Sequence, residues 1–203
     1  MTKPYTQRTN ITTGVSDRMM IKMKYTTFID LGAVPSPRWF FRGNSINDPD
    51  QTGVGGQPTG HDEWSNFYNR YCVYSSKINV EYCNANSATS GNVLCNVVPL
   101  DDTASRTYDE LATYPYARTK TLVPISGGGN PVRLTNYMGT KKLFATNILD
   151  DLYKAGFNSN PTRQFYWCVA ADSMDGMTNV NINAKVTITY YVMLYDRKNL
   201  LAS

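Results

Sequence analysis

The sequence of 203 residues predicts one all-β domain, an eight-stranded Greek-key β-sandwich of the jelly-roll type with long loops and short helices. Composition supports this fold class. Glu, a strong helix former, occurs three times, whereas Thr, Asn and Tyr, which favour strands and turns, are abundant. The pattern supports it too, because alternating apolar and polar segments recur roughly once every 25 residues, a wider spacing than hairpins need.

The N-terminal part of the chain predicts an arm, two strands and a short helix. Residues 1–17, rich in Thr, Asn and Gln, are expected to form a flexible arm, and residues 18–203 the folded domain. Alternation over 19–29 predicts a half-buried strand. Residues 39–41 form a short apolar strand after a Pro-Ser-Pro stretch, and Asp62 is expected to cap a short helix.

The middle of the chain mixes further strands with short helical signals. Thr107-x-x-Glu110 is a capping box that predicts the start of a small helix. The 140–155 stretch is expected to hold a helical turn or two, ending at Gly156. Further strands are predicted at 71–83, 92–98, 118–125, 131–137 and 163–171.

The last strand has the clearest pattern. Its apolar residues all share one parity: Val180, Ile182, Ala184, Val186, Ile188, Tyr190, Val192 and Leu194. Polar residues such as Lys185 and Thr187 occupy the other parity, which predicts a strand with one buried face. At about 3.3 Å per residue this run would span about 50 Å, so we expect it to bend or bulge midway.

Residues that enzymes and metal centres use are scarce. His61 is the single histidine, so a His-rich metal site would lack ligands. It lies in a Gly- and Asp-rich loop, where we expect it to be exposed. The aspartate pairs lack EF-hand spacing, and turns explain them better. No nucleophile elbow, zincin or P-loop motif occurs. We therefore expect a protein without catalysis, cofactor or metal.

Two further classes are disfavoured. The four cysteines fit neither a disulfide framework nor a CxxC site and are interpreted as small buried apolar residues: Cys72, Cys83, Cys95 and Cys168. No run of about 18 apolar residues exists, so we expect no membrane-spanning helix.

The net charge of +4 is unevenly distributed. Residues 1–42 contain seven basic and two acidic side chains, whereas residues 43–203 contain thirteen basic and fourteen acidic ones. The positive excess therefore lies in the first fifth of the chain. This suggests a polyanionic partner for that end, with an ordinary solvated tail as the alternative.

Between residues 42 and 78 the order of residues becomes specific. The segments are Arg42-Gly43-Asn44-Ser45, Asn47-Asp48-Pro49-Asp50, Gly56-Gln57-Pro58-Thr59-Gly60, Asp62-Glu63-Trp64-Ser65-Asn66-Phe67-Tyr68, Tyr71-Cys72-Val73 and Ser75-Ser76-Lys77-Ile78. This block resembles the capsid proteins of circular Rep-encoding single-stranded DNA viruses, the circovirus-like group. The looser resemblance extends over about residues 19–197 and includes Asn136–Lys142 and Gln164–Trp167.

The resemblance implies a viral jelly roll that assembles into a small T=1 icosahedral shell around circular single-stranded DNA, with the virion as its location. It also implies assembly in the host nucleus. Members of that group usually begin with a long Arg-rich arm that binds DNA, whereas this chain begins with only Lys3 and Arg8. Nuclear import therefore does not carry over from the resemblance, and no host receptor is indicated.

In viral jelly rolls the first, third, sixth and eighth strands commonly form the sheet nearer the shell interior. The resemblance assigns these places to the strands predicted at 19–29, 71–83, 131–137 and 180–195. Their outward parity, with Arg18 and the arm, gives the residues that we expect to bind DNA: Lys3, Arg8, Arg18, Lys22, Lys24, Lys77, Arg133 and Lys185. The alternative is that these residues only keep the sheet face soluble.

Loop aromatics are expected to anchor contacts between subunits, because Tyr and Trp are favoured at interfaces. The residues are Tyr5, Tyr108, Tyr114 and Tyr116, whereas Trp39, Trp64 and Trp167 are assigned to the core. Two other functions remain alternatives. A secreted carbohydrate-binding jelly roll would be expected with a signal peptide and calcium or disulfides, and a cupin-type enzyme needs at least two metal-binding histidines.

Overall fold

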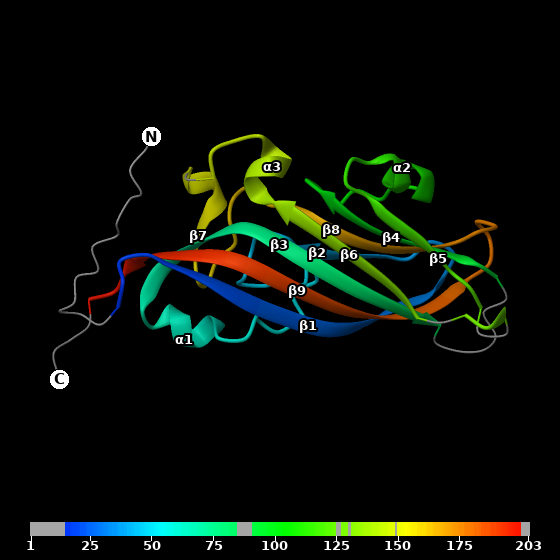
Figure 1. Ribbon diagram of the computed structural model, residues 1–203, viewed down its shortest axis with the longest axis horizontal. Helices are drawn as coiled ribbons and strands as arrows, with labels where there is room; N and C mark the ends of the chain where they lie inside the picture. Colours follow the sequence, from blue (N-terminus) through cyan, green and yellow to red (C-terminus); the bar gives the residue numbers. More distant parts are fainter. Residues whose placement is uncertain (1–14, 85–90, 125–126, 130, 149, 200–203) are drawn as a thin grey trace, which may run out of the picture.

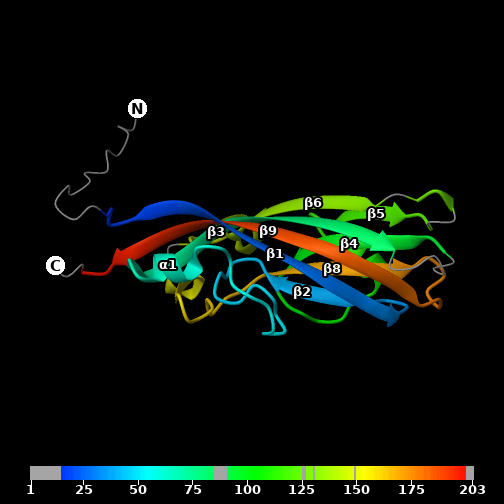
Figure 2. The same ribbon diagram turned by 90° about the horizontal axis from the view of Figure 1, so that it is seen from below.

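Two antiparallel sheets make up the computed structural model, which describes residues 15–84, 91–124, 127–129, 131–148 and 150–199. The strands are β1 (Met19–Val34), β2 (Arg38–Arg42), β3 (Tyr68–Asn84), β4 (Val93–Leu100), β5 (Arg118–Leu122), β6 (Val132–Gly139), β7 (Lys154–Gly156), β8 (Tyr166–Ser173) and β9 (Val180–Arg197). The α-helices are α1 (His61–Ser65), α2 (Tyr108–Thr113) and α3 (Thr140–Phe144). The long strands β1, β3 and β9 run along the long axis of the molecule (Figures 1 and 2).

The strand order confirms the predicted jelly roll. One sheet has the order β1-β9-β3-β6, and the other has the order β2-β8-β4-β5. The chain passes repeatedly between the sheets, as the two Greek keys of a jelly roll require. The four strands that we expected to share a sheet do so. A short extra strand, β7, also pairs with β3.

The region before Gly156 differs partly from the prediction. It contains α3 and a 3₁₀ turn at Asp151–Tyr153, in agreement with the expected helical turns. It does not end in a helix cap, however, because Lys154–Gly156 pairs antiparallel with β3. Strand pairing with a distant segment carries no local sequence signal. The predicted helical stretch therefore included three residues that form a strand.

The core lies between the sheets, and β9 contributes most regularly to it. The eight apolar residues of its inward parity are each at most 2% exposed, which confirms the predicted alternation. The expected bulge is found in its neighbours instead of in β9 itself. The register with β9 shifts between Asp30 and Ala33 of β1 and between Val73 and Ser75 of β3, and the extra residue lies in β1 and in β3 respectively.

The second sheet is buried on both of its faces in β4 and β8. Helix α2 packs over the outer face, where Leu111 joins Val98, Leu100, Cys168 and Ala170 in a small apolar cluster. The capping box that predicted this helix is present. The backbone N–H of Thr107 donates to Glu110 Oε2 at 2.8 Å, and the N–H of Glu110 donates to Thr107 Oγ1 at 3.4 Å.

Helix α1 corrects two predictions. Its N-cap is Gly60, whose φ of 86° suits glycine, and Asp62 lies within the first turn instead of at the cap. His61 is buried at 2% exposure, so the prediction of an exposed loop histidine is wrong. Its Nδ1 lies 3.0 Å from Asp62 Oδ1 and its Nε2 3.0 Å from the carbonyl oxygen of Phe157. The histidine therefore joins α1 to the loop after β7.

The cysteines and tryptophans that were predicted to be in the core differ in how deeply they are buried. Cys72, Cys95 and Cys168 are buried free thiols, and Cys83 is half-buried. Trp167 is fully buried, and its Nε1 donates to Ser76 Oγ at 2.9 Å. Trp39 and Trp64 are partly buried against the main core. In the part of the chain that the structure describes, no helix has the length and apolar character needed to cross a membrane.

Candidate nucleic-acid interface

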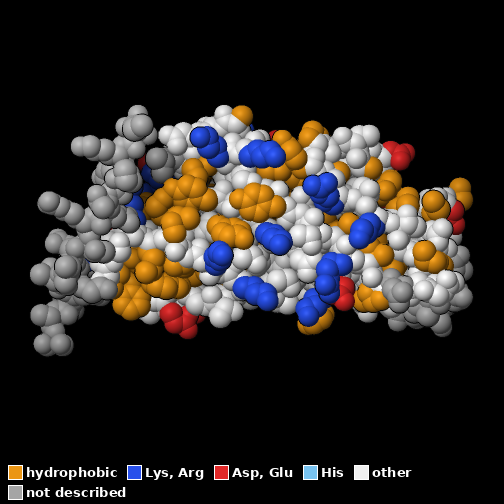
Figure 3. Space-filling model, viewed as in Figure 1, with side chains coloured by type: hydrophobic (Ala, Val, Ile, Leu, Met, Phe, Trp, Pro, Cys, Tyr) orange, Lys and Arg blue, Asp and Glu red, His pale blue; other side chains and the backbone are white. Residues whose placement is uncertain are grey.

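Five basic residues lie on the open part of the outward face of the β1-β9-β3-β6 sheet, and we call this part the basic face. They are Lys22, Lys24, Lys77, Arg133 and Lys185, and all are exposed. Their neighbours in sequence, such as Met23, Ile78 and Val186, point into the core, so alternation directs the basic residues outward. Lys and Arg side chains are spread across this face, with few acidic ones among them (Figure 3). The predicted placement is confirmed, and the predicted binding of nucleic acid stays a prediction.

The strand register arranges these residues in rows across the sheet. Lys24 is opposite Thr189, Thr189 is opposite Lys77, and Lys77 is opposite Tyr137. A shallow groove of about 370 Å³ follows these rows, and it is lined by Lys24, Lys77, Asn79, Arg133, Thr135, Thr187 and Thr189. Ammonium groups and hydroxyl donors in one groove suit the oxygens of a phosphate backbone.

One acidic residue reduces the charge of the basic face. Arg133 Nη2 lies 2.7 Å from Glu81 Oε2, across the β3–β6 pair. The hydrogen bond from Arg133, its charge and that of Lys185 lower the pKa of the Glu81 carboxyl. Arg133 is thus already paired. The four lysines form no ion pair with an acidic side chain among the described residues, so their charge is free for a ligand.

The other predicted DNA contacts lie at or beyond the edge of this region. Arg18 is exposed just before β1, and its charge partly opposes the burial that raises the pKa of Tyr74 on β3. Lys3 and Arg8 lie outside the described residues. Two lysines that strand parity did not select, Lys141 and Lys142, are exposed on α3 directly after β6. Their helical position explains why a parity argument misses them.

Aromatic rings lie among the cations of the basic face. The ring centroids of Tyr137 and Tyr191 are 6.3 Å apart, with the ring planes at 72°. Lys22 Nζ lies 5.4 Å from the ring centroid of Tyr191, and Lys185 Nζ lies 5.8 Å from that of Phe28. The same alternation that directs the lysines outward also directs Phe28, Tyr137 and Tyr191 outward, so the sequence pattern contains this signal.

Three of the tyrosines predicted as subunit anchors lie around α2 and the turn before β5, and the fourth, Tyr5, lies outside the described residues. Tyr108 and Tyr114 are half-buried around α2, and Tyr114 packs against the apolar cluster beneath that helix. Tyr116 is 44% exposed, with Lys142 Nζ 4.2 Å from its ring centroid. Tyr116 therefore has the largest free surface of these three, and their part in assembly stays a prediction.

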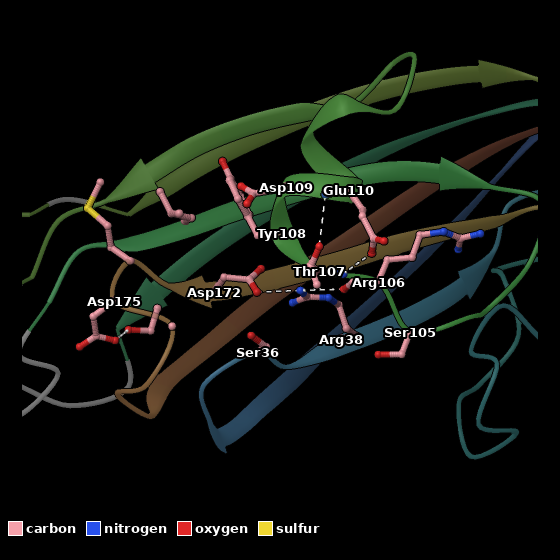
Figure 4. Close-up of a pocket in the computed structure, with 14 residues that line it drawn as sticks. Ser36, Arg38, Ser105, Arg106, Thr107, Tyr108, Asp109, Glu110, Asp172 and Asp175 are labelled. Atoms are coloured by element: carbon pink, nitrogen blue, oxygen red, sulfur yellow. Dashed lines mark hydrogen bonds and ion pairs between the residues drawn. The ribbon is translucent and has the colours of Figure 1, made fainter.

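A cavity of about 560 Å³ opens beside α2, under the segment 105–110 and the turn after β8. Arg38 and Asp172 form part of its wall (Figure 4), and their side chains, 9% and 6% exposed, are joined by a 2.7 Å ion pair. Arg38 Nη2 also donates to the carbonyl oxygen of Arg106. These groups hold the 105–110 segment on the sheet. No group of three or more metal-ligating side chains occurs among the described residues.

Comparisons with known proteins give weak likenesses. No protein-family model matches the chain, and no curated protein matches it in sequence. A structure of turnip yellow mosaic virus aligns over 93% of this chain and 86% of its own, with 7% identity and a TM-score of 0.49. The 60-mer BFDV capsid protein aligns over 92% and 97%, with 11% identity and a TM-score of 0.48. A semi-empty virus-like particle of the nodavirus of the giant freshwater prawn Macrobrachium rosenbergii aligns over 91% and 97%, with 9% identity and a TM-score of 0.47.

Likenesses of this strength assign no function by themselves. The fold is established by the strand order of this chain.

Proposed function

We propose that this chain is a viral capsid protein whose copies assemble into a small icosahedral shell and whose basic face contacts packaged circular single-stranded DNA. The observation that carries the proposal is the concentration of free lysines on one outward sheet face of a jelly roll. The order of residues between 42 and 78 supports it independently. The virion is then the location of the protein, and a second copy of the chain is its main partner.

The chemistry of the basic face suits a ligand that is long, anionic and of any sequence. Lys22, Lys24, Lys77 and Lys185 present flexible ammonium groups in place of a rigid array of donors aimed at base edges. Contacts of this kind neutralise phosphates and release counterions, and they do not distinguish sequence. Each neutralised phosphate of a single strand adds about 0.7 to the slope of log affinity against log salt concentration.

The two sheets differ in the surface that they offer to nucleic acid. The outward face of β4 and β8 in the other sheet is covered by α2, so these two strands offer no open lysine surface. Loops and short helices around the sandwich, including the exposed ring of Tyr116, supply the contacts between copies. The lysines then face the enclosed nucleic acid, and the loops face neighbouring subunits.

Electron microscopy of the purified full chain tests assembly, and protection of bound DNA from nuclease tests packaging. The proposal predicts closed particles of uniform size and protected single-stranded DNA released only after denaturation. A protein that remains monomeric across salt concentration and pH would refute the capsid role. Particles that form but neither bind nor protect DNA would refute the packaging role and leave the assembly role standing.

A further inference from the structure

Tyr137 and Tyr191 form an aromatic pair in the middle of the basic face. Tyr137 is on β6 and is 57% exposed, and Tyr191 is on β9. Strand β3 lies between β6 and β9, so the two backbones are about 10 Å apart at the usual strand spacing. The ring centroids are nevertheless 6.3 Å apart. The rings therefore lean toward each other over β3.

The residues of β3 beneath the pair leave room for this arrangement. Ser75, the β3 residue opposite Tyr191, is also opposite Gly139 of β6. The side chain of Ser75 is small, and that of Gly139 is only a hydrogen atom. The extra residue of the β3 bulge precedes Ser75, so the bulge brings this small residue to the outward side at this row. The same shift brings Lys77 outward two residues later.

Cations surround the aromatic pair on the face. Lys22 is opposite Tyr191 in the β1–β9 register, and its Nζ lies 5.4 Å from the ring centroid. Lys77 is opposite Tyr137 in the β3–β6 register and lines the neighbouring groove. An aromatic pair with free surface, with Lys22 beside one ring and Lys77 opposite the other residue in the register, matches the combination that proteins use for single strands: stacking for the base and charge for the phosphates.

We infer that Tyr137 and Tyr191 form a base-stacking site for single-stranded nucleic acid within the basic face. This inference rests on the proposed function and adds a property to it. Lysines alone bind phosphates of single strands and duplexes alike. A stacking site adds affinity only for single strands, because the faces of duplex bases are already stacked on one another. The basic face therefore prefers single strands to duplexes.

Substitutions at Tyr137 test this inference. Binding of the full chain to a fluorescent oligothymidylate, and to a duplex with the same number of phosphates, is measured by anisotropy over a salt series. Tyr137→Ala is expected to weaken single-strand binding about tenfold and to leave duplex binding and both salt slopes unchanged. Tyr137→Phe keeps the ring and is expected to bind as the wild type does. Phe67→Ala removes an exposed ring elsewhere and serves as the matched control.

A second measurement needs no variant. An oligonucleotide containing 5-bromouracil, irradiated in complex with the wild type, is expected to crosslink to peptides that contain Tyr137 or Tyr191. Crosslinks confined to other peptides, or equal losses for single strand and duplex in Tyr137→Ala, would overturn the stacking site. If the wild type binds neither ligand, the proposed packaging role fails as well. Binding that depends on lysines but not on Tyr137 refutes the stacking site alone.

Discussion

Removing two lysines from the basic face gives the most direct measure of its role. Lys24 and Lys77 are suitable because both line the same groove and lie in one row across the sheet, with Thr189 between them. Neither forms an ion pair with a described acidic side chain, so changing each to Gln removes charge without releasing a partner. The double variant Lys24→Gln/Lys77→Gln should keep its fold, because exposed substitutions of this kind usually change stability by less than about 0.5 kcal/mol.

The expected magnitude follows from counterion release. Two lost phosphate contacts lower the salt slope by about 1.4, which at about 0.1 M salt corresponds to roughly 25-fold weaker binding to a single strand. Two exposed lysines outside the basic face give a control with the same net charge. Lys120 lies on β5 of the other sheet, and Lys198 follows β9. The control variant Lys120→Gln/Lys198→Gln should bind as the wild type does.

Fluorescence anisotropy with a labelled oligothymidylate at several salt concentrations measures both quantities. Thermal unfolding of the three proteins confirms that each is folded. If the control pair loses as much affinity and salt slope as the groove pair, net charge and not the basic face determines binding, and the proposed role of the face is refuted.

Three further predictions concern an ion pair, a carboxylate and a thiol. Asp172→Ala leaves the buried guanidinium of Arg38 without its ion-pair partner. The free energy of unfolding, measured by denaturant titration, should fall by about 3–5 kcal/mol. The double variant Arg38→Met/Asp172→Leu replaces the ion pair by an apolar pair, and its stability should stay near that of the wild type. Glu81→Gln frees Arg133 and should tighten single-strand binding about fivefold at pH 7. Because the pKa of Glu81 is lowered, wild type and variant should converge only below the ordinary carboxyl pKa of about 4.3. Cys83, half-buried, should react first with a thiol reagent, and the buried thiols should react only on unfolding.

Strand parity predicted most of the fold that matters for the candidate site. The alternation of β9 identified both its core residues and its outward residues, and every inward residue from Val180 to Leu194 is buried. The sharing of one sheet by four strands required the family resemblance in addition, because parity within a strand does not identify its neighbours. Together they place Lys22, Lys77 and Lys185 on one face from the sequence alone.

Features that depend on contacts between distant segments were not predictable in this way. The pairing of Arg133 with Glu81 follows from the β3–β6 register, which no local pattern specifies. His61 is buried because the loop containing Phe157 packs on α1, nearly a hundred residues away in the chain. The outer face of β8 is apolar because α2 covers it, so Cys168 is buried although it points away from the main core.

The β3 bulge determines where the open part of the basic face begins. Before the bulge, Cys72 is opposite Met193, on the outward side, yet it is buried in a cluster with Ile148 and Tyr153. After the bulge, the outward residues are Ser75 and then Lys77, which is exposed.

The segment after α3 thus covers one end of the sheet, and the lysines and tyrosines occupy the part left open. A one-residue slip of β9 would move Lys185 into the core and Val186 to the surface, at the cost of burying a charge. The register that builds the core therefore also builds the binding face. Outward substitutions such as Lys77→Gln can change affinity without changing the fold, whereas changes at the bulge should alter both together.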